Sequence, residues 1–301
     1  MKTVTDSPEY DFVKFLEKIN YRRDDWSALY FGLSRAVDHD YLMDNLPNLK
    51  TILDEYSRKF EDLYSTIQEM CSAAKADAIY KFTDHDILVM VKIKNADQSL
   101  QFQDIFSQLS NKLTVAKCTY THVSDDYNNL VKLSDKKILS MKKMEAYREL
   151  TDFNKVSSIG LRRSKRFEPR VMIVEDDRFT AAYTSNLLNR DFEVIHARNG
   201  EEAIRYYIEY APDTVFLDIH LPGMTGHQTL KALRAVDSKA FIVMMSVDTI
   251  RENVMAACKL GAQSFLKKPF NKDRLLKVAR KSPFLSAQSN QHEDGQQVLG
   301  A

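Results

Sequence analysis

The stretch TVFLDIHLPGMTG, residues 214–226, organises the C-terminal half of the chain. It begins with an apolar run rich in β-branched and aromatic residues, which is typical of a buried parallel strand. Asp218 follows the run, and Pro222, Gly223 and Gly226 then predict a turn before the next helix. In an open parallel sheet, the strand ends form the binding crevice. A carboxylate is costly to bury there without partners, so we expect other residues to supply them.

From Arg170 onward, the sequence alternates between apolar runs and helical patterns. Five strands are predicted, at residues 171–174, 192–197, 214–218, 241–246 and 265–268. The helices that follow them are predicted at residues 177–189, 200–210, 228–235, 250–260 and 272–280. Five βα units with short connections predict an α/β fold with a doubly wound, five-stranded parallel sheet.

Charged and polar residues follow four of these strands at their carboxyl ends. Glu175 and Asp176 follow the first strand, Asp218 the third, Ser246 the fourth and Lys268 the fifth. Three carboxylates in one crevice repel one another, and Mg²⁺ with oxygen ligands would offset that charge. Lysine supplies a point charge for an anion, and serine supplies a hydroxyl donor. The set therefore predicts a site that holds a phosphoryl group on a carboxylate.

Together, these residues make positions 168–285 similar to the receiver domain of response regulators in bacterial two-component systems, which is flavodoxin-like. The motifs that carry the resemblance are Val174-Glu175-Asp176, Asp218, Pro222-Gly223-Met224, Gly226, Ser246 and Lys268-Pro269-Phe270. They occur in the family's order and at its spacing, over less than half of the chain.

The resemblance implies a phosphorelay in which Asp218 accepts a phosphoryl group from a phospho-histidine donor. The donor would be a sensor histidine kinase or a histidine phosphotransfer protein. Mg²⁺ is the implied cofactor, held by Asp176, by Asp218, by the backbone carbonyl of His220 and, through water, by Glu175. His220 and Asp248 occupy positions that tune the attacking water in this family, which leaves the lifetime of the phosphorylated form open.

The resemblance also assigns the phosphoryl oxygens to Ser246 and Lys268. Phe265 stands where the family has an aromatic switch residue whose rotamer follows the hydroxyl residue. Val247 stands where a smaller residue is common, which predicts narrower access to the phosphoryl group. Asp177 lies one place beyond the family's acidic pair, and we interpret it as the start of the first helix.

Length and composition bound the remaining possibilities. The chain has 301 residues, which is comfortable for two domains, and its formal net charge of +1 favours neither nucleic acid nor membrane. Three scattered cysteines fit a reducing compartment better than a disulfide framework. We see no signal peptide and no run near the ~20 apolar residues that span a bilayer. A cytoplasmic protein is therefore expected.

Residues 1–158 predict a mixed α/β domain rich in helix. Ser7 and Pro8 are typical of a helix start, and a second helix is predicted over residues 24–37 from the spacing of its apolar residues. Residues 46–70 carry a heptad-like apolar pattern with spacings of three and four. That pattern fits either a homodimer seam or an amphipathic helix that packs on its own domain.

A hairpin is predicted next, with strands at residues 78–83 and 87–91 around Asp84-His85-Asp86. A helix through residues 102–109, a strand at 115–123 and a helix at 134–150 are expected to follow. This order is loosely similar to diguanylate cyclase domains, which carry paired glycines at the hairpin, whereas residues 1–159 hold one glycine, Gly32, outside it. Asp84-His85-Asp86 suggests a metal site, but polar residues at the tip of a hairpin are more commonly solvated turn residues.

Two segments are expected to lack a packed fold. Residues 159–169 are basic and predict an interdomain linker, either solvated or in contact with nucleic acid, an acidic partner or anionic lipid. Residues 286–301 are rich in Gln, Ser, Gly and Asn, which predicts a disordered tail. We find no DNA-binding helix-turn-helix.

The leading hypothesis is a phosphorylation-controlled signalling protein whose N-terminal half binds a partner or a second copy of the chain. It would not be an enzyme with a separate catalytic output, although a receiver accepts a phosphoryl group and can dephosphorylate itself. The alternatives are an N-terminal degenerate nucleotide cyclase-like output and an interaction scaffold that works without phosphorylation.

Overall fold

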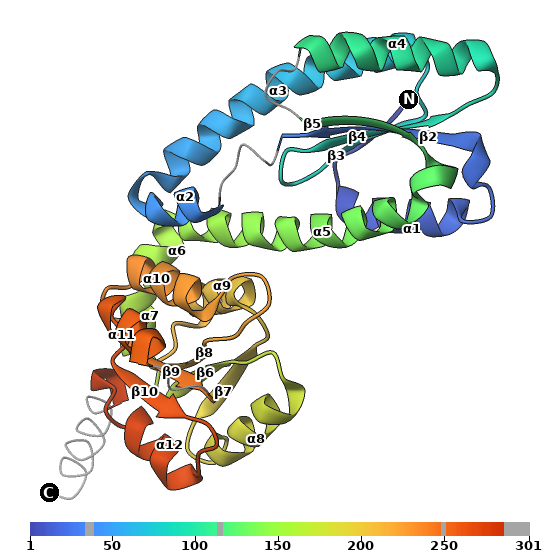
Figure 1. Ribbon diagram of the computed structural model, residues 1–301. Coiled ribbons are helices and arrows are strands. Elements are labelled where there is room, and N and C mark those ends of the chain that lie inside the picture. Colours follow the sequence, from blue (N-terminus) through green and yellow to red (C-terminus); the bar gives the residue numbers. More distant parts are fainter. Residues whose placement is uncertain (34–38, 113–116, 248–250, 286–301) are drawn as a thin grey trace, which may run out of the picture. The chain divides into compact units, whose positions relative to one another are not determined.

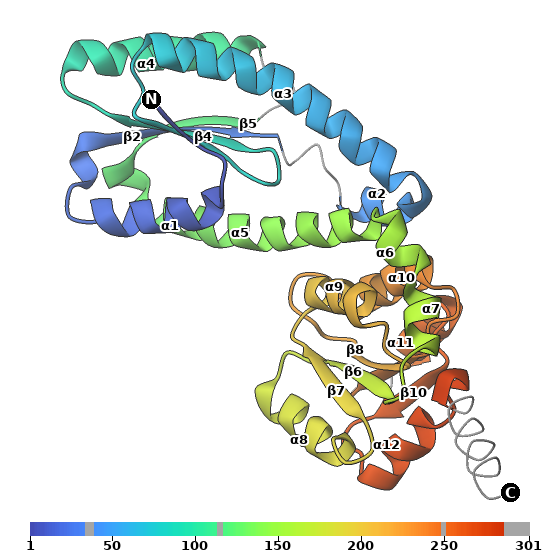
Figure 2. The ribbon, with the colours of Figure 1, turned by 180° about the vertical axis from the view of Figure 1, so that it is seen from behind.

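The computed structural model describes residues 1–33, 39–112, 117–247 and 251–285 (Figures 1 and 2). The chain divides after Met144 into two compact units, which we call unit 1 (Met1–Met144) and unit 2 (Glu145–Ala301). Each unit contains one five-stranded sheet with its own core. The two units are described separately.

Unit 1 is built on a mixed sheet with strand order β1-β3-β4-β2-β5, in which the pair β1 and β3 is parallel and the other pairs are antiparallel. Its strands are β1 (Lys2–Val4), β2 (Trp26–Gly32), β3 (Ala78–Lys81), β4 (Ile87–Lys92) and β5 (Lys117–His122). Its helices are α1 (Pro8–Ile19), α2 (His39–Asp44), α3 (Leu49–Ala73), α4 (Ala96–Lys112) and α5 (Val123–Leu150), with short 3₁₀ turns at Arg23–Asp25 and Leu46–Asn48. Helix α5 continues into unit 2.

Each face of this sheet is covered by a pair of helices (Figure 1). Alternate residues of β4 point to opposite faces, so that Ile87 and Val89 pack with α3 and α4, while Leu88 and Met90 pack with α1 and α5. The segment from β2 to β5, with α3 and α4 as its crossings, has the βαββαβ order of a ferredoxin-like fold. The expected mixed α/β domain is confirmed.

The helix predicted over residues 24–37 is wrong for the part that the structure describes. Residues Trp26–Gly32 form strand β2, which pairs with β4 on one side and β5 on the other. Ala28 and Leu29 are both buried although they point to opposite faces, because β2 is covered on both sides. A strand that is apolar on both faces lacks the alternation that separates strand from helix in a sequence. Residues 34–38 lie outside the described part.

The apolar stripe predicted over residues 46–70 packs on its own domain. Helix α3 begins at Leu49, after a 3₁₀ turn that contains Pro47. Phe60 and Ile67 are buried in one core with residues of β2 and β4. Because the centre of the stripe already packs against the sheet, its side chains are not exposed to form a seam with a second copy of the chain.

The hairpin of β3 and β4 is confirmed, but its tip is buried rather than solvated. Asp84, His85 and Asp86 are all less than 10% exposed. Nζ of Lys137, from α5, lies 2.7 Å from Oδ2 of Asp84 and also bonds Asp86, which accepts a second bond from the hydroxyl of Tyr30. Burial raises the pKa of Asp84 despite the lysine, which acts in the opposite direction. The ammonium of Lys137 therefore lies between the two carboxylates, in the position that a bound metal ion would need.

Lys137→Met is expected to destabilise unit 1 by about 3–5 kcal/mol, because it leaves Asp84 and Asp86 as uncompensated buried charges. The matched control is Lys136→Met, which changes an exposed side chain on the same helix. Fluorescence of Trp26, the chain's one tryptophan, reports the urea unfolding of this unit. Equal midpoints for the two variants would contradict the assignment.

Unit 2 contains the predicted parallel sheet, with strand order β10-β9-β8-β6-β7 and parallel pairing throughout. Its strands are β6 (Arg170–Val174), β7 (Glu193–Ala197), β8 (Thr214–Asp218), β9 (Ile242–Ser246) and β10 (Ser264–Lys267). Its helices are α6 (Phe153–Ser157), α7 (Ile159–Ser164), α8 (Arg178–Leu188), α9 (Gly200–Tyr210), α10 (Gly226–Val236), α11 (Arg251–Lys259) and α12 (Lys272–Ala279). The sheet is doubly wound, with α8 and α12 on one face and α9, α10 and α11 on the other (Figure 2). Asp177 caps α8 by accepting a bond from the backbone N–H of Thr180 at 2.8 Å, as expected.

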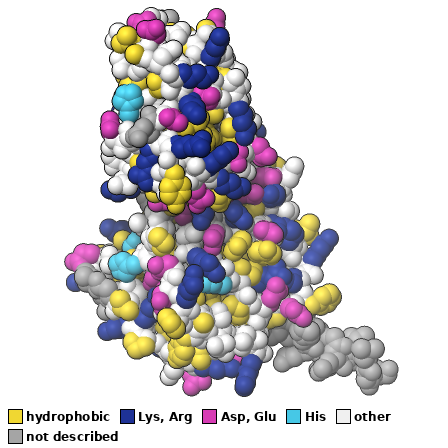
Figure 3. Space-filling model, turned by 90° about the vertical axis from the view of Figure 1, so that its right-hand side faces the viewer, with side chains coloured by type: hydrophobic (Ala, Val, Ile, Leu, Met, Phe, Trp, Pro, Cys, Tyr) yellow, Lys and Arg dark blue, Asp and Glu magenta, His cyan; other side chains and the backbone are white. Residues whose placement is uncertain are grey.

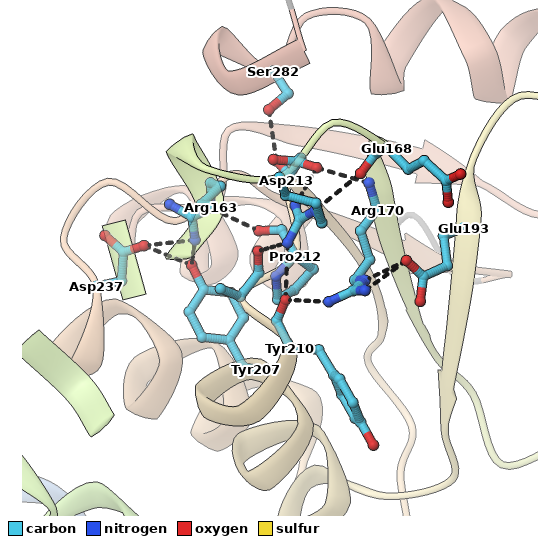
Figure 4. Close-up of polar contacts among 12 residues, drawn as sticks. Arg163, Glu168, Arg170, Glu193, Tyr207, Tyr210, Pro212, Asp213, Asp237 and Ser282 are labelled. Atoms are coloured by element: carbon cyan, nitrogen blue, oxygen red, sulfur yellow. Dashed lines mark hydrogen bonds and ion pairs between the residues drawn. The ribbon is translucent and has the colours of Figure 1, made fainter. Parts of the chain in front are cut away.

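The basic segment expected as a solvated linker contains α7 and packs within unit 2 (Figure 4). Arg163 is 4% exposed, and its guanidinium donates to Asp237 and to the hydroxyl of Tyr207 at 2.9 Å, and to the carbonyl of Pro212 at 3.1 Å. The ring of Phe284 lies 4.0 Å from the guanidinium carbon. Arg163 is therefore a structural residue of this unit.

Two further arginines extend this contact (Figure 4). Arg166 binds the buried carboxylate of Asp213 at 2.5 Å, and Arg170 binds Glu193 at 2.6 Å. Ser282, after α12, donates to the carbonyl of Asp213 at 2.6 Å. Residues that precede the predicted receiver region and a residue near its C-terminal end therefore converge on the turn between α9 and β8.

Two global features bear on the expected partners. None of the described helices is long and apolar enough to cross a membrane. On the face drawn in Figure 3, Lys and Arg side chains are interspersed with Asp and Glu side chains.

Candidate functional site

The predicted site residues meet at the carboxyl edge of the parallel sheet in unit 2. Glu175 follows β6, Asp218 ends β8, Ser246 ends β9 and Lys268 follows β10. The backbone N–H of Lys268 donates to the carbonyl of Ser246 at 2.8 Å, which holds the ends of β10 and β9 together. The order β10-β9-β8-β6 places these four ends side by side, as expected for a crevice in such a sheet.

Three carboxylates form the centre of this site. One oxygen from each of Glu175, Asp176 and Asp218 lies within 4.8 Å of the others. Glu175 and Asp218 are 2% and 5% exposed, whereas Asp176 is exposed to solvent. Among the described residues, this is the group of acidic side chains close enough to hold a metal ion.

Lys268 provides the positive charge opposite these carboxylates. Its Nζ lies 2.5 Å from Oε2 of Glu175 and 3.1 Å from Oδ1 of Asp218. Burial raises the pKa of Glu175, repulsion by Asp218 acts in the same direction, and the bond with Lys268 only partly offsets them. The site therefore holds more negative charge than one ammonium neutralises.

This donor set fits Mg²⁺. Carboxylate oxygens on a partly open edge, with room for water, are the ligands that this ion takes in proteins. Glu175, Asp176 and Asp218 would supply the carboxylates, and the backbone carbonyl of His220 lies two residues beyond Asp218 on the loop after β8. The excess negative charge in the crevice is the physical reason to expect a cation there.

The remaining predicted site residues lie around the acidic group. Ser246 is fully buried at the end of β9, and Phe265 is half-buried on the neighbouring strand β10. Val247, which follows Ser246 in the chain, is 66% exposed at the rim of the site. Asp248 lies outside the described residues.

Two residues that the sequence analysis did not single out also contact this edge. The ring of His196, on β7, hydrogen-bonds through Nε2 to the backbone carbonyl of Glu175 at 2.9 Å. Glu201, at the start of α9, is 2% exposed and accepts a hydrogen bond from the backbone N–H of Met224. No spacing rule marks either residue, since their importance depends on which loop the fold places beside them.

Comparison with known proteins gives the same assignment as the geometry. The family model of the response regulator receiver domain matches residues 171–280. The chemotaxis protein CheY of Bacillus subtilis is 36% identical over 115 residues, which are 38% of this chain and 96% of that protein. CheY of Listeria monocytogenes is 38% identical over 115 residues, which are 38% of this chain and 97% of that protein. The chain belongs to the response regulator receiver family.

Solved structures of receiver proteins also match this part of the chain. The chemotaxis protein CheY4 of Vibrio cholerae is 29% identical, with 38% of this chain and 98% of that chain covered and a TM-score of 0.37. A CheX–CheY complex from Borrelia burgdorferi with BeF₃ and Mg²⁺ is 31% identical, with 38% and 87% covered and a TM-score of 0.36. As a receiver, the region 171–280 belongs to two-component signalling, and receivers generally bind Mg²⁺.

Proposed function

We propose that the protein is a response regulator in which Asp218 accepts a phosphoryl group from a phospho-histidine donor. The observation that carries this proposal is the convergence of Glu175, Asp176, Asp218 and Lys268 at one sheet edge. Bound Mg²⁺ would offset the negative charge of the acceptor and of the incoming phosphoryl group. Lys268 already contacts Asp218, so its ammonium needs little movement to pair with a phosphoryl oxygen.

An apolar groove beside the site suits a donor protein. Phe179 and Val247 are 87% and 66% exposed, and with Tyr183 and Phe270 they line a groove of 410 Å³ that reaches Lys268. Exposed aromatic side chains next to a charged site are typical of protein-binding surfaces. We propose that a sensor histidine kinase or a phosphotransfer protein contacts this groove when its phospho-histidine approaches Asp218.

The proposed switch lies between the site and the face formed by α11, β10 and α12. A phosphoryl group on Asp218 would draw Ser246 toward it and leave room for Phe265 to turn inward, which changes this face between two packed arrangements. Coupling of this kind amounts to ~1–3 kcal/mol, or five- to 150-fold in affinity. Met255, on α11, is 48% exposed and is the apolar side chain that we expect such a change to affect.

The test compares the mass of the full chain, by light scattering, with and without Mg²⁺ and a beryllofluoride phosphate mimic. We expect the mimic to change self-association, and Met255→Asp to weaken the change by placing a charge in the contact. Arg198→Asp is the matched control, because Arg198 is exposed and follows β7, the edge strand opposite β10 in the sheet. A second measurement compares the capture of a donor kinase by the full chain with and without the mimic. If the mimic binds and changes neither the mass nor this capture, the proposed switch is wrong.

We propose a binding role, with no separate catalytic output, for unit 1. Its ferredoxin-like strand order is the observation that favours the alternative, a nucleotide cyclase-like output. Against that alternative, the hairpin tip is closed by Lys137 and lacks glycine, so that backbone N–H groups are not open to a phosphate. Formation of a cyclic dinucleotide from GTP and Mg²⁺ would reverse this ranking. If the protein binds neither Mg²⁺ nor the mimic, the result would favour the other alternative, an interaction scaffold that works without phosphorylation.

A further inference from the structure

Glu201 is a buried carboxylate outside the acidic group of the site. It lies in the first turn of α9 and is 2% exposed. A carboxylate in such a position is costly unless the surrounding groups hydrogen-bond it, although the N-terminus of a helix favours negative charge. The groups that it contacts therefore indicate what it does.

The carboxylate of Glu201 lies against the loop between β8 and α10. Its Oε1 accepts a hydrogen bond from the backbone N–H of Met224 at 3.2 Å. Gly223 has φ of +81°, and a Cβ built on it would lie 2.7 Å from Oε1 and 3.1 Å from Oε2 of Glu201. The absence of a side chain at Gly223 thus lets the carboxylate reach the backbone of the turn.

The same loop carries the group that the receiver resemblance assigns to the metal. The backbone N–H of Gly226 donates to the carbonyl of Ile219 at 3.0 Å, so residues 220–225 leave the end of β8 and return to the same point. His220 is the first residue of this closed loop, and Asp218 immediately precedes its base. A Cβ on Gly226 would lie 2.2 Å from the carbonyl oxygen of Asp218, which shows how tightly the loop closes.

Helix α9 contacts the loop through a second residue. A Cβ on Gly200 would lie 2.7 Å from Cβ of Met224, so the start of the helix and the tip of the loop are in direct contact. The loop is therefore held at its base by Gly226 and at its tip by the first turn of α9.

We propose that Glu201 is a positioning residue that fixes the β8–α10 loop and thereby sets the direction of the His220 backbone carbonyl toward Mg²⁺. The inference rests on the proposed metal-dependent function. Residues that hold metal ligands in place typically cost 10–100-fold in metal affinity when they are changed. Without the carboxylate, the N–H of Met224 has no acceptor from α9, and the loop is free to adopt other arrangements.

The experiment measures Mg²⁺ binding to the full chain by titration calorimetry, together with hydrogen exchange of residues 219–226 in the metal-free protein. Glu201→Ala is expected to weaken Mg²⁺ binding about tenfold and to speed exchange in the loop. Glu201→Gln, which keeps an acceptor oxygen, should show a smaller defect in both. Glu202→Ala is the matched control, because Glu202 lies on the same turn and binds the backbone of Arg198 instead.

Two further variants keep the result decisive. Gly223→Ala places a Cβ against the carboxylate of Glu201 and, because φ is +81°, also strains the turn, so it should weaken Mg²⁺ binding at least as much as Glu201→Ala. Asp176→Ala, which deletes a predicted direct ligand, should lose more affinity than either. Wild-type Mg²⁺ binding and wild-type loop exchange in folded Glu201→Ala would overturn the positioning role alone. A wild-type protein that binds no Mg²⁺ would overturn the proposed function with it.

Discussion

Asp218→Asn is expected to remove almost all phosphoryl uptake from acetyl phosphate in the presence of Mg²⁺. The amide keeps the shape of the side chain, but it has neither the charge nor the nucleophilic oxygen needed for an acyl phosphate. Asp218 lies 5% exposed beside Lys268, so the substitution also removes one of the two carboxylates that hold the ammonium. Intact-mass spectrometry should show one added phosphate on the wild type and almost none on the variant.

The matched control for this prediction is Asp177→Asn. Asp177 lies beside the acidic group in the sequence, but its side chain caps α8, a role that asparagine also fills. The control therefore changes one nearby charge and leaves the acceptor in place, and we expect it to be phosphorylated like the wild type. Equal labelling of Asp218→Asn and Asp177→Asn would show that the acceptor is another residue.

Arg163→Ala is expected to destabilise unit 2 by about 3–5 kcal/mol, the usual cost of removing one partner from a buried ion pair. The guanidinium binds Asp237, Tyr207 and the carbonyl of Pro212, so the substitution leaves all three groups without this partner at once. Hydrogen exchange of β8 and α9 at increasing urea concentration measures the effect. Lys165→Ala, an exposed change just beyond α7, is the control, and equal stability of the two variants would contradict the assignment.

The effect of Arg163→Ala should depend on pH in a definite direction. Burial opposes ionisation of Asp237, but bonds from Tyr207, from the backbone N–H of Lys239 and from Arg163 together lower its pKa below the usual value. A carboxyl whose pKa is lowered by folding stabilises the fold above its unfolded pKa, about 3.9, and loses that contribution as the pH falls through the folded value. The difference between wild type and variant is therefore expected to shrink below about pH 4.

The receiver and its site could be predicted from the sequence because their signals are local. The strands of unit 2 are short apolar runs covered on both faces, and Asp218, Ser246 and Lys268 each stand at or just after the end of one. In a parallel sheet, connections of alternating strand and helix bring those ends to one edge, so the order of residues alone places the site. The structure confirmed the fold and placed these side chains together, and their roles stay predictions.

The errors arose where long-range contacts decide the environment of a residue. Trp26–Gly32 has helical spacing but forms β2, because β4 and β5 pair with it on both sides. Arg163 and Lys137 carry charges that a sequence places on the surface, yet each is buried where distant carboxylates meet it. Their partners, Asp237 and Asp84, lie tens of residues away, and no periodicity indicates such a pairing.

By itself, the sequence determined the fold of the C-terminal region and the order of the groups at its site, because strand ends and turn residues are encoded within a few positions of one another. Only the tertiary structure decided that the apolar stripe of α3 packs on its own sheet, that the basic segment around Arg163 belongs to unit 2, and that Glu201 holds the loop after Asp218. Each of these features depends on which surface a side chain contacts. Burial and hydrogen bonding between distant parts of the chain decide that contact, whereas the spacing of residues that are neighbours in sequence does not.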